Sequence, residues 1–322
     1  MKKNLDNISI CIVIPFYNAS KQISKVISQI PEFVNYVVII DDCSLEELPK
    51  NEIISNINPF SKVFFTKTEI NSGVGGATKI GFLKSIELDS DITIKVDADN
   101  QMDLSYLKHL IFPILNKEAE MCKGNRFSDF LALSKMPFIR RFGNLALSFL
   151  IKIATGYWSN FDPTNGFFAI KTKELKNIKF KNLSNRYYFE TSLLSELYFY
   201  KNRIKDVPMP AIYGDEKSNM NIFKMPFLFG KNLTKTFVKR IIKEYFLYNF
   251  SIASVYILFG FPLFLFGFFY GIYCWNYYNR LNIYAPTGTI MLITLSIIIG
   301  FQLILQAIQY DIENSPKTKF KR

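Results

Sequence analysis

The chain has 322 residues, 49% of them hydrophobic, a mean hydropathy of +0.11 and a formal net charge of +12. This apolar content excludes a disordered chain, and its uneven distribution argues against a wholly soluble globule. The length alone predicts about two domains.

The first hundred residues alternate strand-like and helical stretches. Strands are expected at ISICIVIPF, NYVVIIDDCS, KVFFTKTEI and DITIKVDAD, and helices near residues 20–29 and 76–88. Continuous Val/Ile runs are typical of strands buried on both faces of a parallel sheet. The N-terminal apolar run is therefore expected to be the first strand and not a signal peptide, since it lacks a cleavage site. The βαβα order predicts a doubly wound α/β domain over residues 1–220, with ligands at the carboxyl ends of its strands.

Carboxylates directly follow the last of these strands. Asp97, Asp99 and Asp103 are spaced along the segment VDADNQMD, and Gln101 lies between them. Carboxylates this close repel one another unless a cation lies among them. Oxygen ligands at alternate positions suit Mg²⁺ or Mn²⁺, which can also bridge a diphosphate. The alternative is a solvated acidic turn.

Two further segments follow strands or enter helices. Asp41 and Asp42 end the second strand, where one carboxylate could accept hydrogen bonds from a base or ribose and the other could cap the next segment. The Gly-rich stretch NSGVGGATKIGF, which includes Gly73, enters a helix whose N-terminus suits an anion or close packing. It matches neither the dinucleotide-binding fingerprint nor the P-loop.

Basic residues suited to phosphates come next along the chain. Arg126, Arg140 and Arg141 carry guanidinium groups, whose forked geometry fits phosphate oxygens. Asp162, in DPTNGF, is either a turn residue or a catalytic carboxylate, and Lys217 lies in the loop YGDEKSNMN.

Histidine and cysteine carry no catalytic pattern. The single histidine, His109, falls in an expected amphipathic helix and is interpreted as structural. The four cysteines show neither pairing nor metal-ligand spacing, which is typical of a reducing compartment. If the protein transfers a group to an acceptor molecule, that acceptor would then lose its proton to a carboxylate, or would already be ionised.

The C-terminal third has the pattern of a membrane anchor. Residues 221–250 are expected to form a basic juxtamembrane helix, in which Lys231, Lys235, Lys239 and Lys243 share one face opposite an apolar one. Arg280 is the only charged residue from Tyr245 to Tyr310, so residues 251–310 are expected to hold two membrane spans, about 252–275 and 286–309.

Charge predicts the orientation of that anchor. Basic residues are concentrated in 221–244 and in the tail 311–322, on the outer sides of the helical hairpin. The positive-inside rule then places the catalytic domain and both termini in the cytoplasm. The protein is expected to be a multi-pass protein of the inner membrane. Nucleic-acid binding is not expected, because the positive charge lies beside the expected membrane anchor.

Taken together, the motifs resemble glycosyltransferase family 2, and within it the polyprenyl-phosphate glycosyltransferases related to dolichol-phosphate mannose synthases. The order VIPFYN, IIDDCS, NSGVGGA, VDADNQ, GNRF, DPTNGF, YYFETSLLSEL and VPMPAIYGDEKS matches across nearly the whole chain. The resemblance implies a GT-A fold that binds a nucleotide with a divalent metal, Mg²⁺ or Mn²⁺.

The resemblance also assigns residues, position by position. Those for the nucleotide are Pro15, Tyr17, Asn18, Asp42, Gly73 and Asp97, those for the metal Asp97, Asp99 and Gln101, and those for catalysis Asp99, Asp162, Arg126, Arg140 and Lys217. Arg141 is an equal candidate with Arg140. One departure stands out: the family pattern Y-N-E here ends in Ala19, so the glutamate that would contact the ribose is absent.

The implied reaction is an inverting, metal-dependent transfer of a sugar from a nucleotide-diphosphate sugar to a polyprenyl (undecaprenyl) phosphate, for cell-envelope glycan modification. The acceptor phosphate is already anionic, so no strong base is needed. One alternative is extension of a lipid-linked oligosaccharide on a hydroxyl, with Asp162 or Asp103 as base. Another is a non-catalytic membrane-anchored protein that binds nucleotide sugars. The expected partners are the donor, the lipid acceptor and the bilayer, and a homo-oligomer is compatible with the sequence.

Overall fold

The computed structural model describes residues 5–128, 138–210 and 225–318. These residues divide into a first unit, Met1–Thr236 with Pro316–Arg322, and a second unit, Phe237–Ser315. The expected catalytic domain falls within the first unit and the expected spans within the second.

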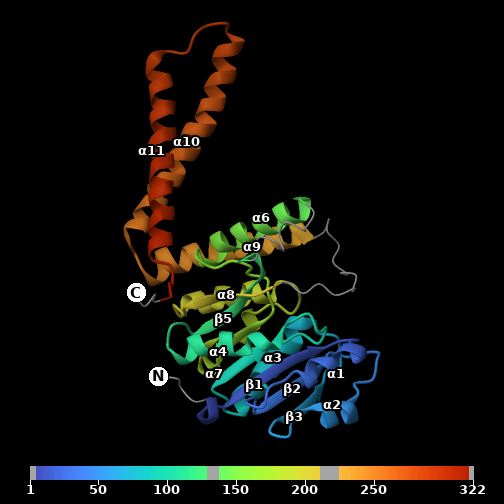
Figure 1. The fold of residues 1–322 in the computed structure, drawn as a ribbon. Helices are drawn as coiled ribbons and strands as arrows, with labels where there is room; N and C mark the ends of the chain where they lie inside the picture. Colours follow the sequence, from blue (N-terminus) through green and yellow to red (C-terminus); the bar gives the residue numbers. More distant parts are fainter. Residues whose placement is uncertain (1–4, 129–137, 211–224, 319–322) are drawn as a thin grey trace. The chain divides into compact units, whose positions relative to one another are not determined.

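A seven-stranded mixed sheet, in the order β3-β2-β1-β4-β6-β5-β7, is the centre of the first unit (Figure 1). Its strands are β1 (Ile10–Phe16), β2 (Tyr36–Asp41), β3 (Lys62–Lys67), β4 (Ile92–Lys95), β5 (Met121–Asn125), β6 (Phe168–Lys171) and β7 (Ile204–Pro208). The pairs of β1 with β2, β2 with β3, β1 with β4 and β5 with β7 are parallel. Strand β6 is antiparallel to both β4 and β5, so the prediction of a mostly parallel, doubly wound sheet is confirmed.

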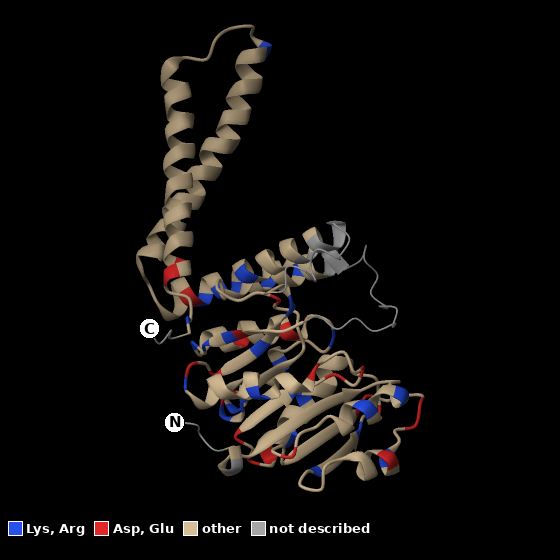
Figure 2. Cartoon of the chain, in the orientation of Figure 1, with Lys and Arg blue, Asp and Glu red and all other residues tan. Residues whose placement is uncertain are grey.

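The second unit contains a helical hairpin of α10 (Ile252–Arg280) and α11 (Thr287–Glu313). Both helices are long and apolar enough to cross a membrane, and Figure 2 shows them free of charged residues except near their ends. They extend a few residues beyond the expected spans at the C-terminal ends. The helices pack closely at small residues, since a Cβ added to Gly300 would lie 2.5 Å from the backbone N of Phe264.

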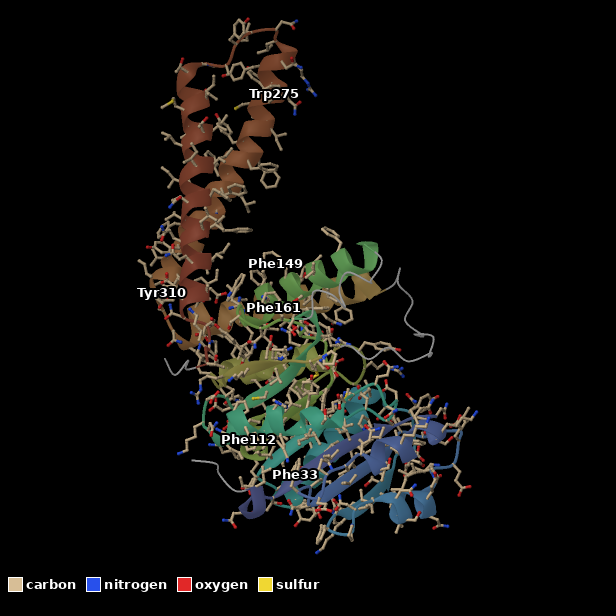
Figure 3. The ribbon with its side chains drawn as sticks, in the orientation of Figure 1. Phe33, Phe112, Phe149, Phe161, Trp275 and Tyr310 are labelled. Atoms are coloured by element: carbon tan, nitrogen blue, oxygen red, sulfur yellow. The ribbon has the colours of Figure 1, made fainter. Side chains whose placement is uncertain are left out.

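A buried ion pair connects the two flanks of this hairpin. Arg240 Nη1 and Nη2 lie 2.6 and 3.0 Å from the two carboxylate oxygens of Asp311, and the Tyr245 hydroxyl donates to the same carboxylate at 2.5 Å. Figure 3 labels Tyr310 beside this end of the hairpin and Trp275 toward its turn, the two levels at which aromatic residues gather in membrane proteins.

Helices α6 (Phe138–Thr155), α8 (Phe189–Phe199) and the start of α9 (Met225–Ile242) pack together within the first unit. Ile151 and Ala154 of α6 share a buried cluster with Tyr188, Phe229 and Leu233. Phe229 and Leu233 of α9 therefore pack on the first unit. A π-helical segment, Lys243–Tyr248, follows α9.

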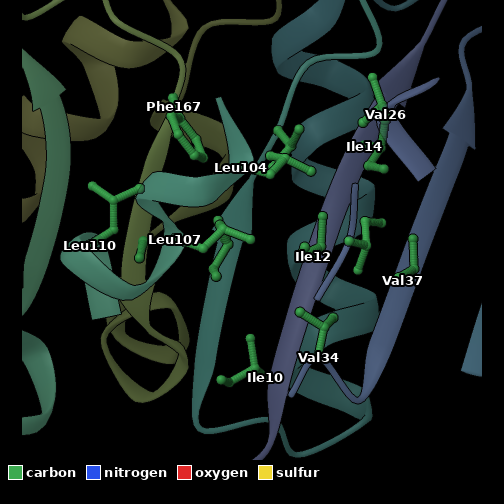
Figure 4. Packing of buried hydrophobic residues seen from close by; sticks show 14 of the residues in the cluster. Ile10, Ile12, Ile14, Val26, Val34, Val37, Leu104, Leu107, Leu110 and Phe167 are labelled. Atoms are coloured by element: carbon green, nitrogen blue, oxygen red, sulfur yellow. The ribbon is translucent and has the colours of Figure 1, made fainter. Parts of the chain in front are cut away.

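The sheet is buried on both faces, as its Val/Ile runs predict. On one face, Ile10, Ile12 and Ile14 pack with α1 (Ser20–Ser28), α2 (Lys50–Asn56) and α4 (Leu107–Leu115), as Figure 4 shows in part. On the other face, Cys11 and Val13 pack with α3 (Val74–Glu87), α7 (Thr172–Asn177) and α8. This double cover leaves the carboxyl ends of the strands as the place for polar chemistry.

Candidate active site

The strand order changes direction between β1 and β4. From β1 the chain goes to β2 and β3 on one side, and β4 then pairs with β1 on the other side. Ligands bind at such a switch point, outside the carboxyl ends of the strands. The residues that follow these two strands, Tyr17 and Asn18 after β1 and Asp97 to Gln101 after β4, are therefore placed at one site.

The residues after β1 form the first wall of this site. Pro15 lies beyond the last residue of β1 that pairs with β4, Val13, so its missing N–H removes no bond to that strand. Tyr17 is half exposed. Asn18 has a left-handed φ of 47°, and its Oδ1 accepts from the Leu45 N–H at 2.9 Å. Its side chain thus fixes the loop after β2.

The Asp42 carboxylate is buried and holds the Gly-rich turn. It accepts hydrogen bonds from the Ser72 N–H at 2.8 Å, the Ser72 hydroxyl at 2.7 Å and the Gly73 N–H at 2.7 Å. Gly73 has a φ of +82°, a conformation that favours glycine. Asp42 and Gly73, both predicted to bind the nucleotide, thus bind each other.

The N-terminus of α3 is used for close packing. The N–H groups of Gly75 and Gly76 donate to the carbonyl of Asn185 at 2.9 and 3.1 Å. A Cβ on Gly75 would lie 2.4 Å from the carbonyl oxygen of Ser184. Of the two interpretations of this Gly-rich stretch, anion site or close packing, the geometry favours close packing.

A buried lysine joins Asp97, a predicted metal ligand, to a glutamate from another element. Lys95 Nζ lies 2.7 Å from Asp97 Oδ1 and 3.3 Å from Oε1 of Glu190, in the first turn of α8. Burial lowers the pKa of Lys95, but the charges of Asp97 and Glu190 outweigh it and raise that pKa above its ordinary value. Burial raises the pKa of Glu190. Lys95 therefore stays charged and supplies a counter-ion to Asp97 from within the protein.

Gly166 closes over this group. A Cβ at this position would lie 2.5 Å from Lys95 Nζ, 2.9 Å from Asp97 Oδ2 and 3.4 Å from Glu190 Oε1. Gly166 lies just before β6, which is antiparallel to its neighbours β4 and β5 and so begins near their carboxyl ends. Phe168, at the start of β6, pairs with both Lys95 and Lys123. The sequence interpretation missed Lys95, Gly166 and Glu190. One signal was available: a lysine in the otherwise apolar strand ITIK.

Asp99 and Gln101 share a tight turn after β4. The Gln101 N–H donates to Asp99 Oδ1 at 3.0 Å, and Asn100 between them has a left-handed φ of 59°. Among the described residues, no three His, Cys, Asp or Glu side chains cluster to hold a metal ion. Two carboxylates and an amide nevertheless fit Mg²⁺ or Mn²⁺, because such ions are usually held by one or two carboxylates together with substrate phosphates. Asp97, Asp99 and Gln101 are the residues that would hold it.

Arg126 and Asp162 form a bidentate ion pair. Arg126 Nε and Nη2 lie 2.7 and 2.8 Å from the two Asp162 oxygens, and the Arg126 N–H also donates, at 3.1 Å. Asp162 is fully buried with a left-handed φ of 48°. Burial raises its pKa, but the hydrogen bonds and charge of Arg126 outweigh this and hold the pKa below its usual value. Asp162 is thus a weak base that orients Arg126.

A second buried lysine, Lys123, fixes the backbone at Asp162. Lys123 Nζ donates to the carbonyls of Phe161 and Asp162, the latter at 2.7 Å, and lies 3.5 Å from Asp206 of β7. The Phe161 N–H also donates to Asp206, at 2.5 Å. The loop that carries Asp162 is therefore fixed by its backbone as well as by its carboxylate.

Three predicted basic residues cannot be placed from this structure. Lys217 lies outside the described residues. Arg140 and Arg141 fall within α6, but their side chains also lie outside what is described.

The family of the chain follows from comparison with known proteins. The model of "Glycosyl transferase family 2" matches residues 11–179, which is more than half of the chain. The chain belongs to glycosyltransferase family 2. The matched range covers Asp42, Gly73, Asp97, Asp99, Gln101, Arg126 and Asp162, and the resemblance seen in the motifs is confirmed.

Two curated relatives each match 63% of this family 2 glycosyltransferase. A UDP-N-acetylglucosamine–dolichyl-phosphate N-acetylglucosaminyltransferase of Methanococcus voltae is 33% identical over 221 residues, or 63% of this chain and 86% of the relative. An uncharacterized protein of Methanocaldococcus jannaschii is 27% identical over 205 residues, or 63% of this chain and 82% of the relative.

Solved structures agree on the fold of this glycosyltransferase. Glucosyl-3-phosphoglycerate synthase from Mycobacterium tuberculosis matches with a TM-score of 0.50 and 16% identity, over 73% of this chain and 82% of that one. A mycobacterial protein matches with a TM-score of 0.53 and 16% identity, over 74% and 79%. At this identity the likeness concerns the GT-A-like fold alone.

Proposed function

We propose that this glycosyltransferase transfers a sugar from a nucleotide-diphosphate sugar to the phosphate of a polyprenyl phosphate, such as undecaprenyl phosphate, with inversion at the anomeric carbon. The observation that carries the proposal is the 33% identical relative, whose name states a UDP-sugar donor and a dolichyl phosphate acceptor. The product would serve cell-envelope glycan modification.

The side chains at the site support an acceptor that needs no base. Asp162, the first candidate base for a hydroxyl acceptor, is paired with Arg126 and has a lowered pKa. Asp103, the second candidate, caps a short helix by accepting from the Ser105 N–H at 2.9 Å. A phosphate acceptor is already anionic near neutral pH and can attack the anomeric carbon directly.

The leaving diphosphate is where charge develops, and stabilising that charge lowers the barrier. A divalent cation held by Asp97, Asp99 and Gln101 would supply this stabilisation. Lys95 lies 2.7 Å from one oxygen of Asp97 and thereby fixes the side chain that would hold this cation. Among the described residues, Arg126, which Asp162 orients, is proposed to bind the phosphate oxygens. Arg140, Arg141 and Lys217 are proposed to complete the basic set.

The second unit supports a membrane location. Arg240 precedes the first apolar helix and Asp311 lies near the end of the second, so their pairing requires both flanks of the hairpin on one side of a bilayer. The basic excess in these flanks supports the cytoplasmic side for the catalytic domain and both termini.

The test is transfer by the full chain in membranes, supplied with a panel of radiolabelled nucleotide sugars and undecaprenyl or dolichyl phosphate. UDP-N-acetylglucosamine is the first donor to try, because it is the one in the relative's name. The expected product is a monoglycosyl phospholipid that mild acid cleaves. Label found only in an elongated oligosaccharide would instead favour a hydroxyl acceptor. Donor binding without turnover on any lipid would favour a binding protein.

A further inference from the structure

Arg186 is exposed and carries an unpaired charge. It lies in the connection between the short helix Phe180–Asn182 and α8. Within the ranges that the structure describes, its guanidinium has neither a hydrogen bond nor an ion pair, whereas Arg126 and Arg203 each have a bidentate carboxylate partner. Most surface arginines are simply solvated, so the charge of Arg186 assigns no function without its surroundings.

The backbone on both sides of Arg186 is fixed. The carbonyl of Asn185 accepts from the N–H groups of Gly75 and Gly76, in the first turn of α3, at 2.9 and 3.1 Å. The carbonyl of Arg186 itself accepts from the N–H of Phe189, the first residue of α8, at 2.8 Å. Arg186 is therefore held against the start of α3, unlike a side chain on a free loop.

The aliphatic stem of Arg186 lies on Gly73. A Cβ added to Gly73 would lie 2.8 Å from Arg186 Cγ and 2.6 Å from the carbonyl oxygen of Asn185. Only glycine leaves room for this approach, and its φ of +82° also favours glycine. Because the Gly73 N–H donates to Asp42, the stem of Arg186 covers the turn that Asp42 holds, where the nucleotide is predicted to bind.

The same segment of chain reaches the predicted metal ligands. Glu190, four residues after Arg186, lies 3.3 Å from Lys95 Nζ, and Lys95 Nζ lies 2.7 Å from Asp97. Residues 186–190 thus connect the Gly-rich turn with a carboxylate predicted to hold the cation. A donor whose nucleoside contacts that turn and whose diphosphate contacts the cation would pass along this segment.

Charge indicates which part of the donor Arg186 would bind. The Asp42 carboxylate is buried and accepts from Ser72 and Gly73, and Glu190 is paired with Lys95. The nucleoside offers neutral groups, whereas the diphosphate carries negative charge. The fork of a guanidinium matches the oxygens of a phosphate, so the diphosphate is the complementary group.

We propose that Arg186 binds the diphosphate of the nucleotide sugar and stabilises it as the leaving group. The inference rests on the proposed function and adds to it a donor ligand that lies beyond residues 11–179, the range that the family model matches. A cation already in place when charge develops on the leaving diphosphate lowers the barrier to transfer.

The experiment measures nucleotide binding by the full chain in detergent, with Mg²⁺ present, by isothermal titration calorimetry. UDP, GDP, CDP and dTDP are titrated into the parent, and the one that binds most tightly is used for Arg186→Gln and Arg186→Lys. The corresponding nucleoside, which lacks phosphates, is measured by displacement. Lys181→Gln is the matched control, because Lys181 is exposed, lies in the short helix before this segment and removes the same charge.

We expect Arg186→Gln to weaken binding of the nucleoside diphosphate roughly tenfold to a hundredfold, the usual loss for a charged hydrogen bond, and to leave nucleoside binding unchanged. Arg186→Lys should recover part of the loss, because it keeps the charge but not the fork. Lys181→Gln should bind like the parent.

Two results would overturn the inference while leaving the proposed function intact. One is equal binding of the nucleoside diphosphate by the parent and Arg186→Gln. The other is an equal loss for nucleoside and diphosphate, which would place Arg186 on the nucleoside. If the parent bound none of the four nucleoside diphosphates, the proposed function would fail together with the inference.

Discussion

The ammonium group of Lys95 lies 2.7 Å from Oδ1 of Asp97, at the buried end of β4. A lysine this deeply buried is stable only with a carboxylate partner, and here Glu190 supplies a second one at 3.3 Å. One oxygen of Asp97 is thereby fixed inside the protein. The other oxygen is positioned by the same bond, so the geometry after β4 depends on Lys95 and Glu190.

Gly166→Ala tests this dependence. The added Cβ would lie 2.5 Å from Lys95 Nζ, so the lysine and with it Asp97 must shift. Overpacking of this kind costs about 1–3 kcal/mol, and expressed at the transition state it lowers the transfer rate roughly tenfold to a hundredfold. Gly230→Ala is the control, because nothing lies within 4 Å of its added Cβ. Equal rates and equal Mn²⁺ affinities in the two variants would show that the crowding is harmless.

Asp99→Asn should remove metal-dependent transfer and leave membrane insertion intact. The amide keeps the size of the side chain but removes a negative ligand, and we expect the rate to fall by about 10²-fold or more. Transfer of label to lipid, with and without EDTA, measures this loss. Asp89→Asn changes an exposed carboxylate paired with Lys176 and should behave like the parent. Undiminished transfer by the parent in EDTA would remove the metal from the mechanism.

Asp162→Asn should act on stability as well as on rate. Removing the charge of the buried Asp162 weakens its bidentate pair with Arg126, whose side chain is 40% exposed, and costs about 1–2 kcal/mol, seen as a lower melting temperature. Arg126→Met with Asp162→Asn should be less destabilised than the sum of the single variants, because their effects are coupled. If Asp162 were instead a catalytic base, Asp162→Asn would lower the rate at an unchanged melting temperature.

Glu120 gives the first unit a pH-dependent contribution to stability. Burial raises the pKa of Glu120, but hydrogen bonds from Arg203, two of them at 2.7 and 2.8 Å, outweigh it and lower the pKa from 4.5 to about 2. Because the pKa is lower in the folded state than in the unfolded state, the ionised carboxylate stabilises the fold at pH values above 4.5. This stabilisation is lost as the pH falls from 4.5 toward 2.

Glu120→Gln should therefore lower the free energy of unfolding by roughly 2–3 kcal/mol at neutral pH, with the difference from the parent vanishing at strongly acid pH. Melting followed by near-ultraviolet circular dichroism across pH measures it. Glu87→Gln breaks only a surface pair with Lys84 and should change little at any pH. A constant difference between Glu120→Gln and the parent at all pH values would contradict the linkage.

The N-terminal half of the fold was predictable and the rest was not, for a physical reason. Strands β1, β2 and β4 are predicted by Val/Ile-rich runs, because burial on both faces leaves that mark in the sequence. Strand β5 reads Met-Cys-Lys-Gly-Asn, which has no such pattern. Its burial depends on Lys123 finding carbonyls and Asp206 elsewhere in the chain.

The site shows the same division between local and distant information. The turn from Asp97 to Gln101 is local, so its carboxylates were predicted. Lys95, which pairs with Asp97, also pairs with Glu190, almost a hundred residues away, and Arg126 pairs with Asp162 across a long stretch of chain. Spacing in one sequence cannot report such contacts, whereas a charged residue inside an apolar strand, as at Lys95, can at least indicate that one exists.

The Arg240–Asp311 pair has a consequence for how the protein is made. Arg240 leaves the ribosome 71 residues before Asp311, and both apolar helices are synthesised in between. In the proposed two-span arrangement, the guanidinium must remain in water or on the lipid surface during that interval, because its carboxylate arrives only after the second helix has crossed back. Insertion of that helix would therefore also complete the polar core of this unit, and a chain whose second helix fails to insert would lack the Arg240–Asp311 pair.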